Sequence, residues 1–193
     1  MRIIQGSHRG RKLRSEEVED LRPMRAQVRA ALFNILNARS ARVPGSRFLD
    51  LFAGTGSVGI EALSRGAAQT VFVDVSHEAI RLIKDNLRTL QLSERAVVYH
   101  EDAIKALAQL EAEGQRFDLV FIGPPYGKNL AERALAALAE THLLNEDALV
   151  ITEIFKKEAL REAYGRLKRS DMRRYGDNVL VFYRWMPNQK DRI

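Results

Sequence analysis

Three glycines follow an apolar run at the spacing of a ligand-binding turn. Gly54, Gly56 and Gly59 satisfy the pattern G-x-G-x-x-G between a strand-like and a helical segment. Glycine at these positions allows a tight turn and a close approach of a ligand to the backbone. The same spacing also occurs in a strand-to-helix turn that binds nothing. If the turn binds a cofactor, the candidate contacts in it are Phe52, Gly54, Thr55 and Gly56.

An acidic residue before the glycines indicates which cofactor would fit. Asp50 lies four residues before Gly54, at the expected carboxyl end of the strand. Its carboxylate would repel the pyrophosphate of a dinucleotide but would attract a cation. S-adenosylmethionine carries an α-ammonium and a sulfonium group, so Asp50 favours this cofactor over NAD. The alternative is a carboxylate that braces the loop or caps the helix.

Two more acidic residues follow the next two strand-like runs. Asp74 comes twenty residues after Gly54 and could accept hydrogen bonds from both ribose hydroxyls, with Val75 as a neighbouring contact. Asp102 could accept a hydrogen bond from the adenine amino group, while the backbone N–H of Ala103 faces the ring. Ligands of open α/β sheets bind at the carboxyl ends of the strands. We therefore expect these residues to form one site with Asp50.

A turn with two prolines supplies the candidate catalytic residues. Gly123, Pro124, Pro125 and Tyr126 follow the apolar run Phe117–Ile122. Two prolines fix an irregular extended turn. Such a turn would hold a backbone carbonyl and an aromatic ring in place at the edge of the sheet. The alternative is a simple end of a strand with a packing tyrosine.

The elements that must position these residues alternate between strand-like and helical patterns, which predicts a parallel sheet covered on both faces. The strand-like runs are Arg47–Phe52, Thr70–Asp74, Ala96–His100, Phe117–Ile122 and Ala148–Glu153. The helical patterns are Val58–Ser64, Glu78–Leu90, Ala103–Glu111 and Leu130–Ala139, with Ser76 as a candidate N-cap. After these, Lys156–Ala163 resembles a short helix. Leu167–Tyr175 and Asn178–Trp185 flank a Gly-Asp turn and predict an antiparallel hairpin.

The first 45 residues form a separate, basic extension before the main domain, which we place at residues 46–193. Arg2-Ile3-Ile4 and Arg11-Lys12-Leu13 are two short β-like runs, and Arg25–Leu36 has helical spacing of apolar residues. Residues 1–47 hold eleven Lys and Arg against four Asp and Glu, a balance of +7, whereas the net charge of the chain is +6. The positive excess therefore lies in this segment.

A basic segment of this kind either is a solvated surface or meets the phosphates of a nucleic acid. The charge favours nucleic acid, and the candidate contacts are Arg9, Arg11, Lys12, Arg22, Arg25 and Arg29. A second basic stretch, residues 156–174, holds eight Lys and Arg against three Asp and Glu, and both interpretations stay open for it.

Several classes of protein are excluded by what the 193 residues lack. With no cysteine, the chain has no disulfide framework, thiolate zinc site or iron–sulfur cluster. Its four histidines show no metal-ligand spacing, so we expect no metal. No apolar run approaches the ~20 residues of a membrane span. The first residues lack the apolar stretch of a signal peptide. We expect a soluble, cytoplasmic monomer without a membrane partner.

These motifs together resemble the RsmD family, bacterial methyltransferases that modify a guanine N2 in small-subunit (16S) ribosomal RNA. The resemblance extends over nearly the whole chain and rests on these segments: Arg2-Ile3-Ile4, Arg9–Leu13, Arg22-Pro23, Val28-Arg29, Ala31–Leu36, Asp50–Ala67 and Phe117–Tyr126. It implies a class I S-adenosylmethionine-dependent methyltransferase fold of Rossmann-like type. Such a fold has a seven-stranded, mostly parallel sheet with a C-terminal antiparallel hairpin. The implied partner is small-subunit ribosomal RNA or an assembling 30S particle.

The chain departs from the family pattern at a position that bears on the chemistry. The family usually has aspartate before Pro-Pro, where this chain has Gly123, and Thr-Thr-Asp where it has Met24-Arg25-Ala26. In the family, the aspartate and the proline carbonyl resemble a pair of acceptors for the two hydrogens of the target amine. A reduced site could work here, another acceptor such as Glu153 could substitute, or the chain could bind RNA without catalysis.

Two further functions share some of these motifs. Methylation of adenine N6 in DNA is possible because the proline turn is common to both reactions. An NAD-dependent oxidoreductase would share the glycine loop, but Asp50 and the Pro-Pro turn argue against it.

Overall fold

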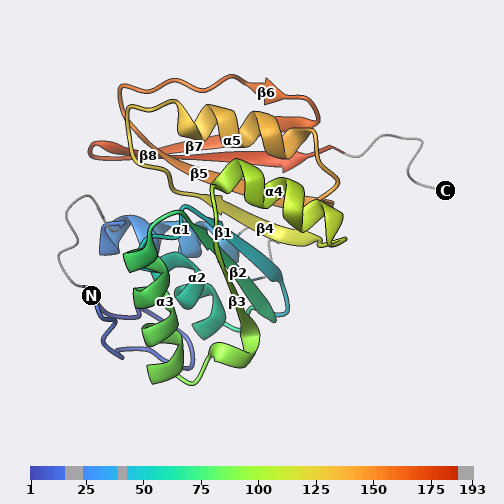
Figure 1. Cartoon of the computed structure of the whole chain (residues 1–193). Coiled ribbons are helices and arrows are strands. Elements are labelled where there is room, and N and C mark those ends of the chain that lie inside the picture. The colour runs from blue at the N-terminus through green and yellow to red at the C-terminus, as the bar shows by residue number, and fades with distance from the viewer. Residues whose placement is uncertain (16–23, 39–42, 187–193) are drawn as a thin grey trace.

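The computed structural model describes residues 1–15, 24–38 and 43–186, in which a single sheet forms the centre (Figure 1). Its eight strands have the order β3-β2-β1-β4-β5-β8-β7-β6. The strands are β1 (Arg47–Leu51), β2 (Gln69–Asp74), β3 (Ala96–His100), β4 (Phe117–Ile122), β5 (Leu144–Phe155), β6 (Ala163–Tyr164), β7 (Leu167–Tyr175) and β8 (Asn178–Trp185). Strands β1 to β5 pair in parallel, and β8, β7 and β6 continue the sheet in antiparallel pairs. The predicted fold class is confirmed.

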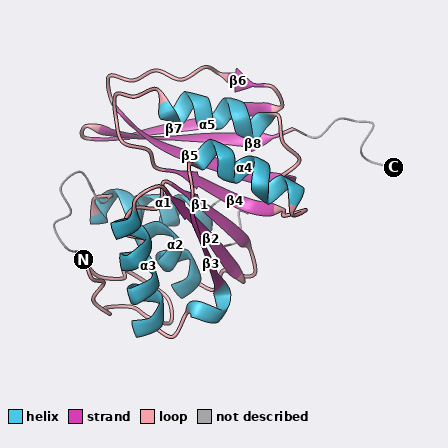
Figure 2. Ribbon diagram, viewed as in Figure 1, coloured by secondary structure: helices cyan, strands magenta, loops and turns pink. Residues whose placement is uncertain are grey.

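Within the described residues, five α-helices cover the two faces of the sheet, and Figure 2 shows their arrangement. They are α1 (Ala26–Ala38), α2 (Ser57–Ser64), α3 (His77–Thr89), α4 (Ala103–Ala112) and α5 (Leu130–Ala139). The side chains of α4 and α5 pack on one face with Leu49, Val73 and Val120. The helices α1, α2 and α3 pack on the other face, where Phe48, Phe72 and Phe121 point. Near-continuous burial of the central strands follows from this two-sided cover.

Two expectations at the C-terminal part of the chain are wrong. The segment Lys156–Ala163 is not a helix, because its backbone bonds to other parts of the chain instead of forming a helical ladder. The Lys156 N–H donates to the Asp177 carbonyl at 2.8 Å, and the Arg161 N–H donates to the Tyr164 hydroxyl at 3.1 Å. The sheet has eight strands instead of seven, because the two-residue strand β6 pairs with β7 after this segment. A strand of two residues is too short to show the alternation of apolar and polar residues from which a strand is predicted.

The N-terminal segment lies along α2 and α3 and is joined to them by hydrogen bonds. Residues 1–15 make a single antiparallel bridge, Arg2 with Lys12, which fits the two short β-like runs. The Ser7 N–H donates to the Ser64 carbonyl of α2 at 2.8 Å, and the Arg14 N–H donates to the Asn86 side chain of α3 at 2.8 Å. The basic segment is therefore seated against the main body of the protein. We call residues 1–15 the N-terminal arm.

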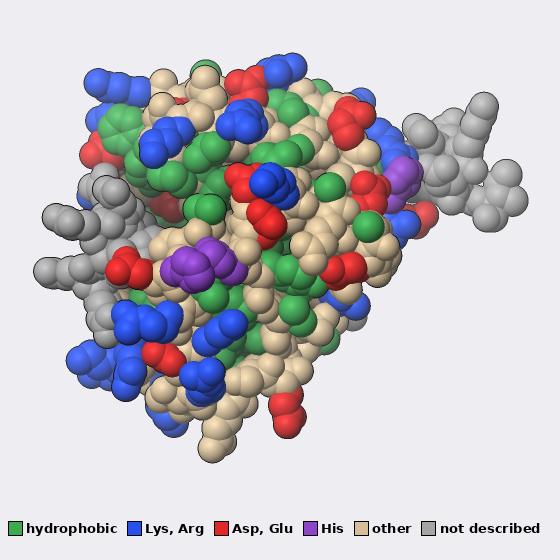
Figure 3. All heavy atoms as spheres, in the orientation of Figure 1, with side chains coloured by type: hydrophobic (Ala, Val, Ile, Leu, Met, Phe, Trp, Pro, Cys, Tyr) green, Lys and Arg blue, Asp and Glu red, His purple; other side chains and the backbone are tan. Residues whose placement is uncertain are grey.

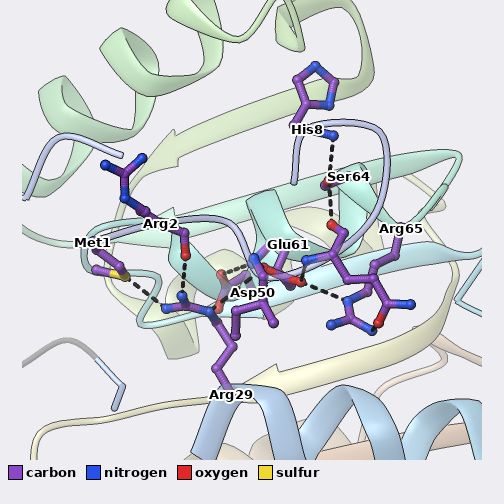
Figure 4. Close-up of polar contacts among 11 residues, drawn as sticks. Met1, Arg2, His8, Arg29, Asp50, Glu61, Ser64 and Arg65 are labelled. Carbon is purple, nitrogen blue, oxygen red and sulfur yellow. Dashed lines mark hydrogen bonds and ion pairs between the residues drawn. The ribbon is translucent and has the colours of Figure 1, made fainter. Parts of the chain in front are cut away.

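A buried carboxylate on α2 holds the arm in place (Figure 4). Glu61 is 1% exposed and accepts hydrogen bonds from the backbone N–H groups of Ile4 and Gln5 at 2.8 and 3.0 Å. It also accepts one from Arg65 Nε at 2.8 Å and forms an ion pair with Arg29 at 3.9 Å. Burial lowers the pKa of the Arg29 guanidinium, and the charge of Glu61 opposes that shift. Loss of one partner of such a buried pair strongly destabilises the folded protein, because the other charge is left buried and unpaired.

Two glycines of the arm allow a matched test of this seat. Gly6 and Gly10 both have a positive φ, 91° and 81°. A Cβ on Gly6 would lie 1.9 Å from the Ser64 carbonyl oxygen, whereas a Cβ on Gly10 would meet nothing within 4 Å. Gly10→Ala should cost only the ~1–2 kcal/mol of the left-handed backbone. Gly6→Ala should cost the same plus about 1–3 kcal/mol of overpacking, or release the arm.

Urea denaturation and the rate of trypsin cleavage within the arm measure the two effects. Faster cleavage in Gly6→Ala than in Gly10→Ala is the expected result. Equal cleavage and equal stability in the two variants would contradict the close seat of the arm on α2.

Candidate active site at the reversal of the sheet

The turn from β1 into α2 is built from residues with left-handed backbone. Phe52, Gly54 and Gly56 have φ values of 61°, 53° and 73°. Gly56 precedes the first turn of α2 and has no side chain to cap it. A Cβ on Gly59 would lie 2.3 Å from the Phe72 ring, so this glycine allows α2 to pack against β2. The motif thus serves the turn and the helix packing as well as any ligand.

Asp50 is the carboxylate that joins the strand to the helix. It is 1% exposed, and its Oδ2 accepts a hydrogen bond from the Gly59 N–H at 2.9 Å. Burial raises the pKa of Asp50 well above its ordinary value; the Gly59 hydrogen bond opposes this, and the Asp74 charge adds to it. Asp50 therefore does brace the loop, which was the alternative to a ligand contact. The two roles are compatible, because a carboxylate has acceptor positions for several donors.

The other two acidic residues also bind backbone N–H groups. Asp74 accepts from Gly54 at 2.7 Å and from Ser76 at 2.9 Å, which ties β2 to the glycine turn. Asp102 is exposed and caps α4 by accepting from Ile104 at 2.9 Å and Lys105 at 3.2 Å. Their contacts with ribose and adenine remain predictions. Val75 is 68% exposed beside them, whereas the side chain of Ala103 is packed in the core.

A cavity lies where the direction of the strand order reverses, between β1 and β4. This is the position at which open α/β sheets bind ligands. It brings together residues from the first turn, the proline turn and β5. The lining residues are Met24, Asp50, Phe52, Ala53, Gly54, Thr55, Ser57, Val58, Phe121, Gly123 and Glu153. Of the predicted cofactor contacts, Asp50, Phe52, Gly54 and Thr55 face this cavity, while Gly56, Asp74, Val75, Asp102 and Ala103 are not among its lining residues.

The proline turn lies between this cavity and a second one. The Gly123 N–H donates to the Leu51 carbonyl at 3.1 Å, which fixes the start of the turn beside β1. Tyr126 is half-buried, its ring centroid lies 5.9 Å from that of Phe155, and its hydroxyl accepts from Asn178 Nδ2 at 2.7 Å. The second cavity is lined by Met24, Arg25, Tyr126, Glu153, Phe155, Asp177 and Asn178.

Some lining residues were not among those selected from the sequence. Asn178 belongs to the tip of the C-terminal hairpin and looks like a turn residue in the sequence. Ser57 and Phe121 belong to patterns that predict only a helix and a strand. An asparagine next to a turn and an apolar strand residue carry no functional signal without the tertiary structure.

The candidate RNA contacts fall into three groups. Arg9, Arg11, Lys12 and Arg25 are exposed, which is compatible with phosphate contacts. The prediction for Arg29 is wrong, because its side chain is 0% exposed and its guanidinium donates to Met1 Sδ and to the Arg2 carbonyl inside the protein. Arg22 lies outside the described residues. Figure 3 shows Lys and Arg side chains gathered over the arm and α3.

The described part of the chain contains neither a candidate metal site nor a helix that could span a membrane. No three His, Asp or Glu side chains of residues 1–15, 24–38 and 43–186 converge on a point that could hold a metal ion. No helix in these ranges is long and apolar enough to cross a membrane.

Comparisons with known proteins agree on the family of this chain. The profile of the family described as Conserved hypothetical protein 95 matches residues 1–184. The Haemophilus influenzae protein named ribosomal RNA small subunit methyltransferase D is 40% identical over 161 residues, which cover 83% of this chain and 81% of that protein. The Escherichia coli protein of the same name is 35% identical over 153 residues, 79% of this chain and 74% of that protein.

Solved structures agree as well. The Escherichia coli protein yhhF matches with a TM-score of 0.84 at 30% identity, over 97% of this chain and 99% of that chain. A protein of Thermus thermophilus matches with a TM-score of 0.80 at 34% identity, over 94% of this chain and 98% of that chain. The sheet, with its cavity at the reversal point, is that of a Rossmann-like methyltransferase. Within that class, this chain belongs to the RsmD family.

The raised pKa of Asp50 predicts how the stability of the protein depends on pH. The folded state holds the Asp50 proton more tightly than the unfolded state, so its contribution to stability is lost as pH rises from the ordinary range of aspartate through the folded pKa. Asp50→Asn keeps an acceptor for the Gly59 N–H but cannot ionise. The gain in free energy of unfolding on this substitution should therefore grow with pH.

Urea denaturation of the native protein and Asp50→Asn at several pH values between about 4 and 8 measures this difference. Asp118→Asn is a control, because Asp118 is a half-buried carboxylate that binds Arg47 N–H and Asn145 away from the cavity. A difference that stays constant or falls with rising pH at Asp50 would contradict the buried, proton-retaining carboxyl.

Proposed function

We propose that this protein methylates the exocyclic N2 amine of a guanine in small-subunit ribosomal RNA, with S-adenosylmethionine as methyl donor. The observation that carries the proposal is the cavity in which the buried carboxylate of Asp50 and the start of the proline turn at Gly123 converge. Membership of the RsmD family and the names of the relatives from Haemophilus influenzae and Escherichia coli support the substrate.

The residues at the cavity fit this donor by their chemistry. Burial raises the pKa of the Asp50 carboxyl, and a cation bound beside it would favour the ionised form, so the two charges would stabilise each other. Gly54 presents backbone without a side chain at the turn. The bound cofactor would supply an activated methyl group: a nitrogen–carbon bond would form as the carbon–sulfur bond breaks, S-adenosylhomocysteine would leave as a neutral thioether, and the amine would release its extra proton to water. No metal is needed for this chemistry.

The protein's own part is to bring the two reactants into line. Holding two reacting atoms in the correct geometry contributes up to several kcal/mol to the rate. The target base must be clear of its neighbours in the RNA for its amine to reach the cavity. Tyr126 can stack on such a base, which would contribute about 1–3 kcal/mol to binding. The Pro124 carbonyl can accept one hydrogen of the amine.

A second candidate function is RNA binding without methyl transfer. The observation that favours it is Gly123, which offers no side chain at the position where the pattern of the family that this chain resembles usually has aspartate. The two candidates share the basic arm and the fold, and they differ only in whether a methyl group is transferred.

Methyl transfer to small ribosomal subunits separates the two candidates. Subunits isolated from a bacterial strain without its own RsmD-family enzyme are incubated with the purified protein and radiolabelled S-adenosylmethionine. We expect label in the small-subunit RNA and N2-methylguanosine in its nuclease digest by mass spectrometry. Binding of the subunits without any label in the RNA would support the non-catalytic alternative. Label in adenine would contradict the proposed target.

The basic arm predicts a salt-dependent affinity for RNA. Replacing Arg9, Arg11 and Lys12 together by Gln should weaken binding of RNAs of any sequence, because phosphate contacts position the RNA without reading it. The slope of log K against log salt should flatten by roughly 0.7 for each phosphate of single-stranded RNA that the variant no longer neutralises.

Fluorescence anisotropy of a labelled RNA at several salt concentrations measures the slope. The matched control replaces three exposed basic residues of other elements, Lys105, Arg116 and Arg133, by Gln. An unchanged slope in the arm variant, or an equal change in the control, would indicate that the arm is only a solvated surface.

A further inference from the structure

Three residues of the parallel sheet share one face at its carboxyl edge. In the register of the sheet, Asp50 pairs with Phe121, and Phe121 pairs with Ile151. Side chains alternate between faces along a strand, so positions two residues further on share the face of the first. Position 123, directly after β4, and Glu153 on β5 therefore follow this row on the same face as Asp50. Both line the cavity with it.

The register at this edge is fixed by a hydrogen bond between the two strands. Thr152 Oγ1 donates to the Ile122 carbonyl at 2.9 Å, and the Cα atoms of these two residues are partners in the ladder. The next residues along the strands are Gly123 and Glu153. The carboxylate of Glu153 on β5 thus stands beside position 123, where the family pattern usually has aspartate.

The space for a side chain at position 123 is taken in this protein. A Cβ on Gly123 would lie 2.7 Å from Cε1 of the Phe121 ring, and Phe121 is only 3% exposed. An aspartate could enter only if this ring moved aside. The acceptor that the strand end lacks therefore has to come from a neighbouring strand.

Glu153 is held in an orientation by a chain of hydrogen bonds. It is 7% exposed in a strand that is otherwise apolar from Ala148 to Ile154 apart from Thr152. The Asn178 amide donates both to Glu153 Oε1 and to the Tyr126 hydroxyl. Since a carboxylate has about four acceptor positions, Glu153 can accept from a substrate while it keeps the Asn178 bond. The same amide links the carboxylate to the ring that would stack on the base.

We propose that Glu153 is the second hydrogen-bond acceptor for the target amine, opposite the Pro124 carbonyl. This role rests on the proposed methyl transfer and makes it more specific. The amine of a purine is a weak nucleophile because its lone pair is delocalised into the ring. Two acceptors that bind its two N–H bonds turn the lone pair toward the methyl carbon. With Glu153 in that place, the glycine at position 123 leaves a complete site.

Glu153→Gln tests the role without removing the bond to Asn178, since the glutamine oxygen still accepts. Its amide would offer a donor to the amine where an acceptor is needed. Loss of one oriented group from a preorganised site costs about 10²–10³ in rate. We expect a fall of this size in the single-turnover rate of subunit methylation. The affinities for S-adenosylmethionine, by calorimetry, and for RNA, by anisotropy, should change less than about 3-fold.

Two comparisons separate an acceptor from a residue that only supports the fold. Glu146→Gln is the matched control, because Glu146 is an exposed glutamate on the same strand, and its rate should equal that of the native protein. Rescue is the second comparison. Phe121→Leu together with Gly123→Asp makes room for a carboxylate directly after β4. The triple variant that adds these two changes to Glu153→Gln should be at least tenfold faster than Glu153→Gln alone. A supporting role would not be rescued from another strand.

The outcomes for the acceptor and for the proposed function are distinct. Equal rates for the native protein and Glu153→Gln would overturn the role of Glu153 and leave the methyl transfer standing. A slow Glu153→Gln with equally weakened S-adenosylmethionine and RNA binding, and with no rescue, would also overturn it. If the native protein transfers no methyl group to the subunits, the proposed function fails, and the role of Glu153 fails with it.

Discussion

The hydrogen bond between the buried carboxylate of Asp50 and the Gly59 N–H joins the end of β1 to the first turns of α2. The glycine turn and the packing of α2 depend on this junction. It lies within a turn of three left-handed residues that reverses the chain directly over the sheet. It also places α2 so closely on β2 that only glycine fits at position 59. Since α2 carries Glu61, the same junction decides where the N-terminal arm can bind.

The helix α2 therefore contacts both the arm, through Glu61, and the cavity, through the bond between Gly59 and Asp50. Glu61 on α2 holds the arm through two backbone N–H groups, and Arg29 on α1 reaches the same carboxylate from the other side. Charges so deeply buried cost free energy unless each is paired. A basic surface anchored in this way can present phosphate contacts at a fixed distance from the cavity. A basic residue can bind phosphates at the surface or stabilise the protein from inside. Arg29 does the second, since it holds the arm and does not reach the surface.

The edge of the sheet where β4 and β5 end shows how a function can be distributed over neighbouring strands. Side chains at equivalent heights on adjacent strands lie close together, so a carboxylate can be supplied from either strand. Here the glycine at position 123 leaves room for the Phe121 ring, and Glu153 lines the same cavity. Asn178, from the antiparallel hairpin, ties Glu153 to Tyr126. The C-terminal hairpin thereby becomes part of the candidate active site rather than a mere extension of the sheet.

Sequence patterns were enough to predict the alternation of strands and helices, the turn after β1 and the final hairpin. These are local properties, because hydrophobic period and turn residues act over a few positions. The sequence also indicated the acidic residues at the strand ends, for the same reason. It failed at Lys156–Ala163 and at β6, where backbone hydrogen bonds to the distant C-terminal hairpin decide the conformation. The prediction of an RNA contact at Arg29 failed because the charge of a residue does not show whether it will be buried in an ion pair with a carboxylate distant in the sequence.

Which residues meet in the cavity could not be predicted from the sequence, because it depends on the packing of distant segments. Glu153 lies thirty positions from Gly123 in the chain, and Asn178 lies another twenty-five beyond it. Their proximity depends on the register between β4 and β5 and on the pairing of β8 with β5. Register is set by packing of the whole sheet between its two layers of helices, and a slip of one residue would turn each side chain to the opposite face.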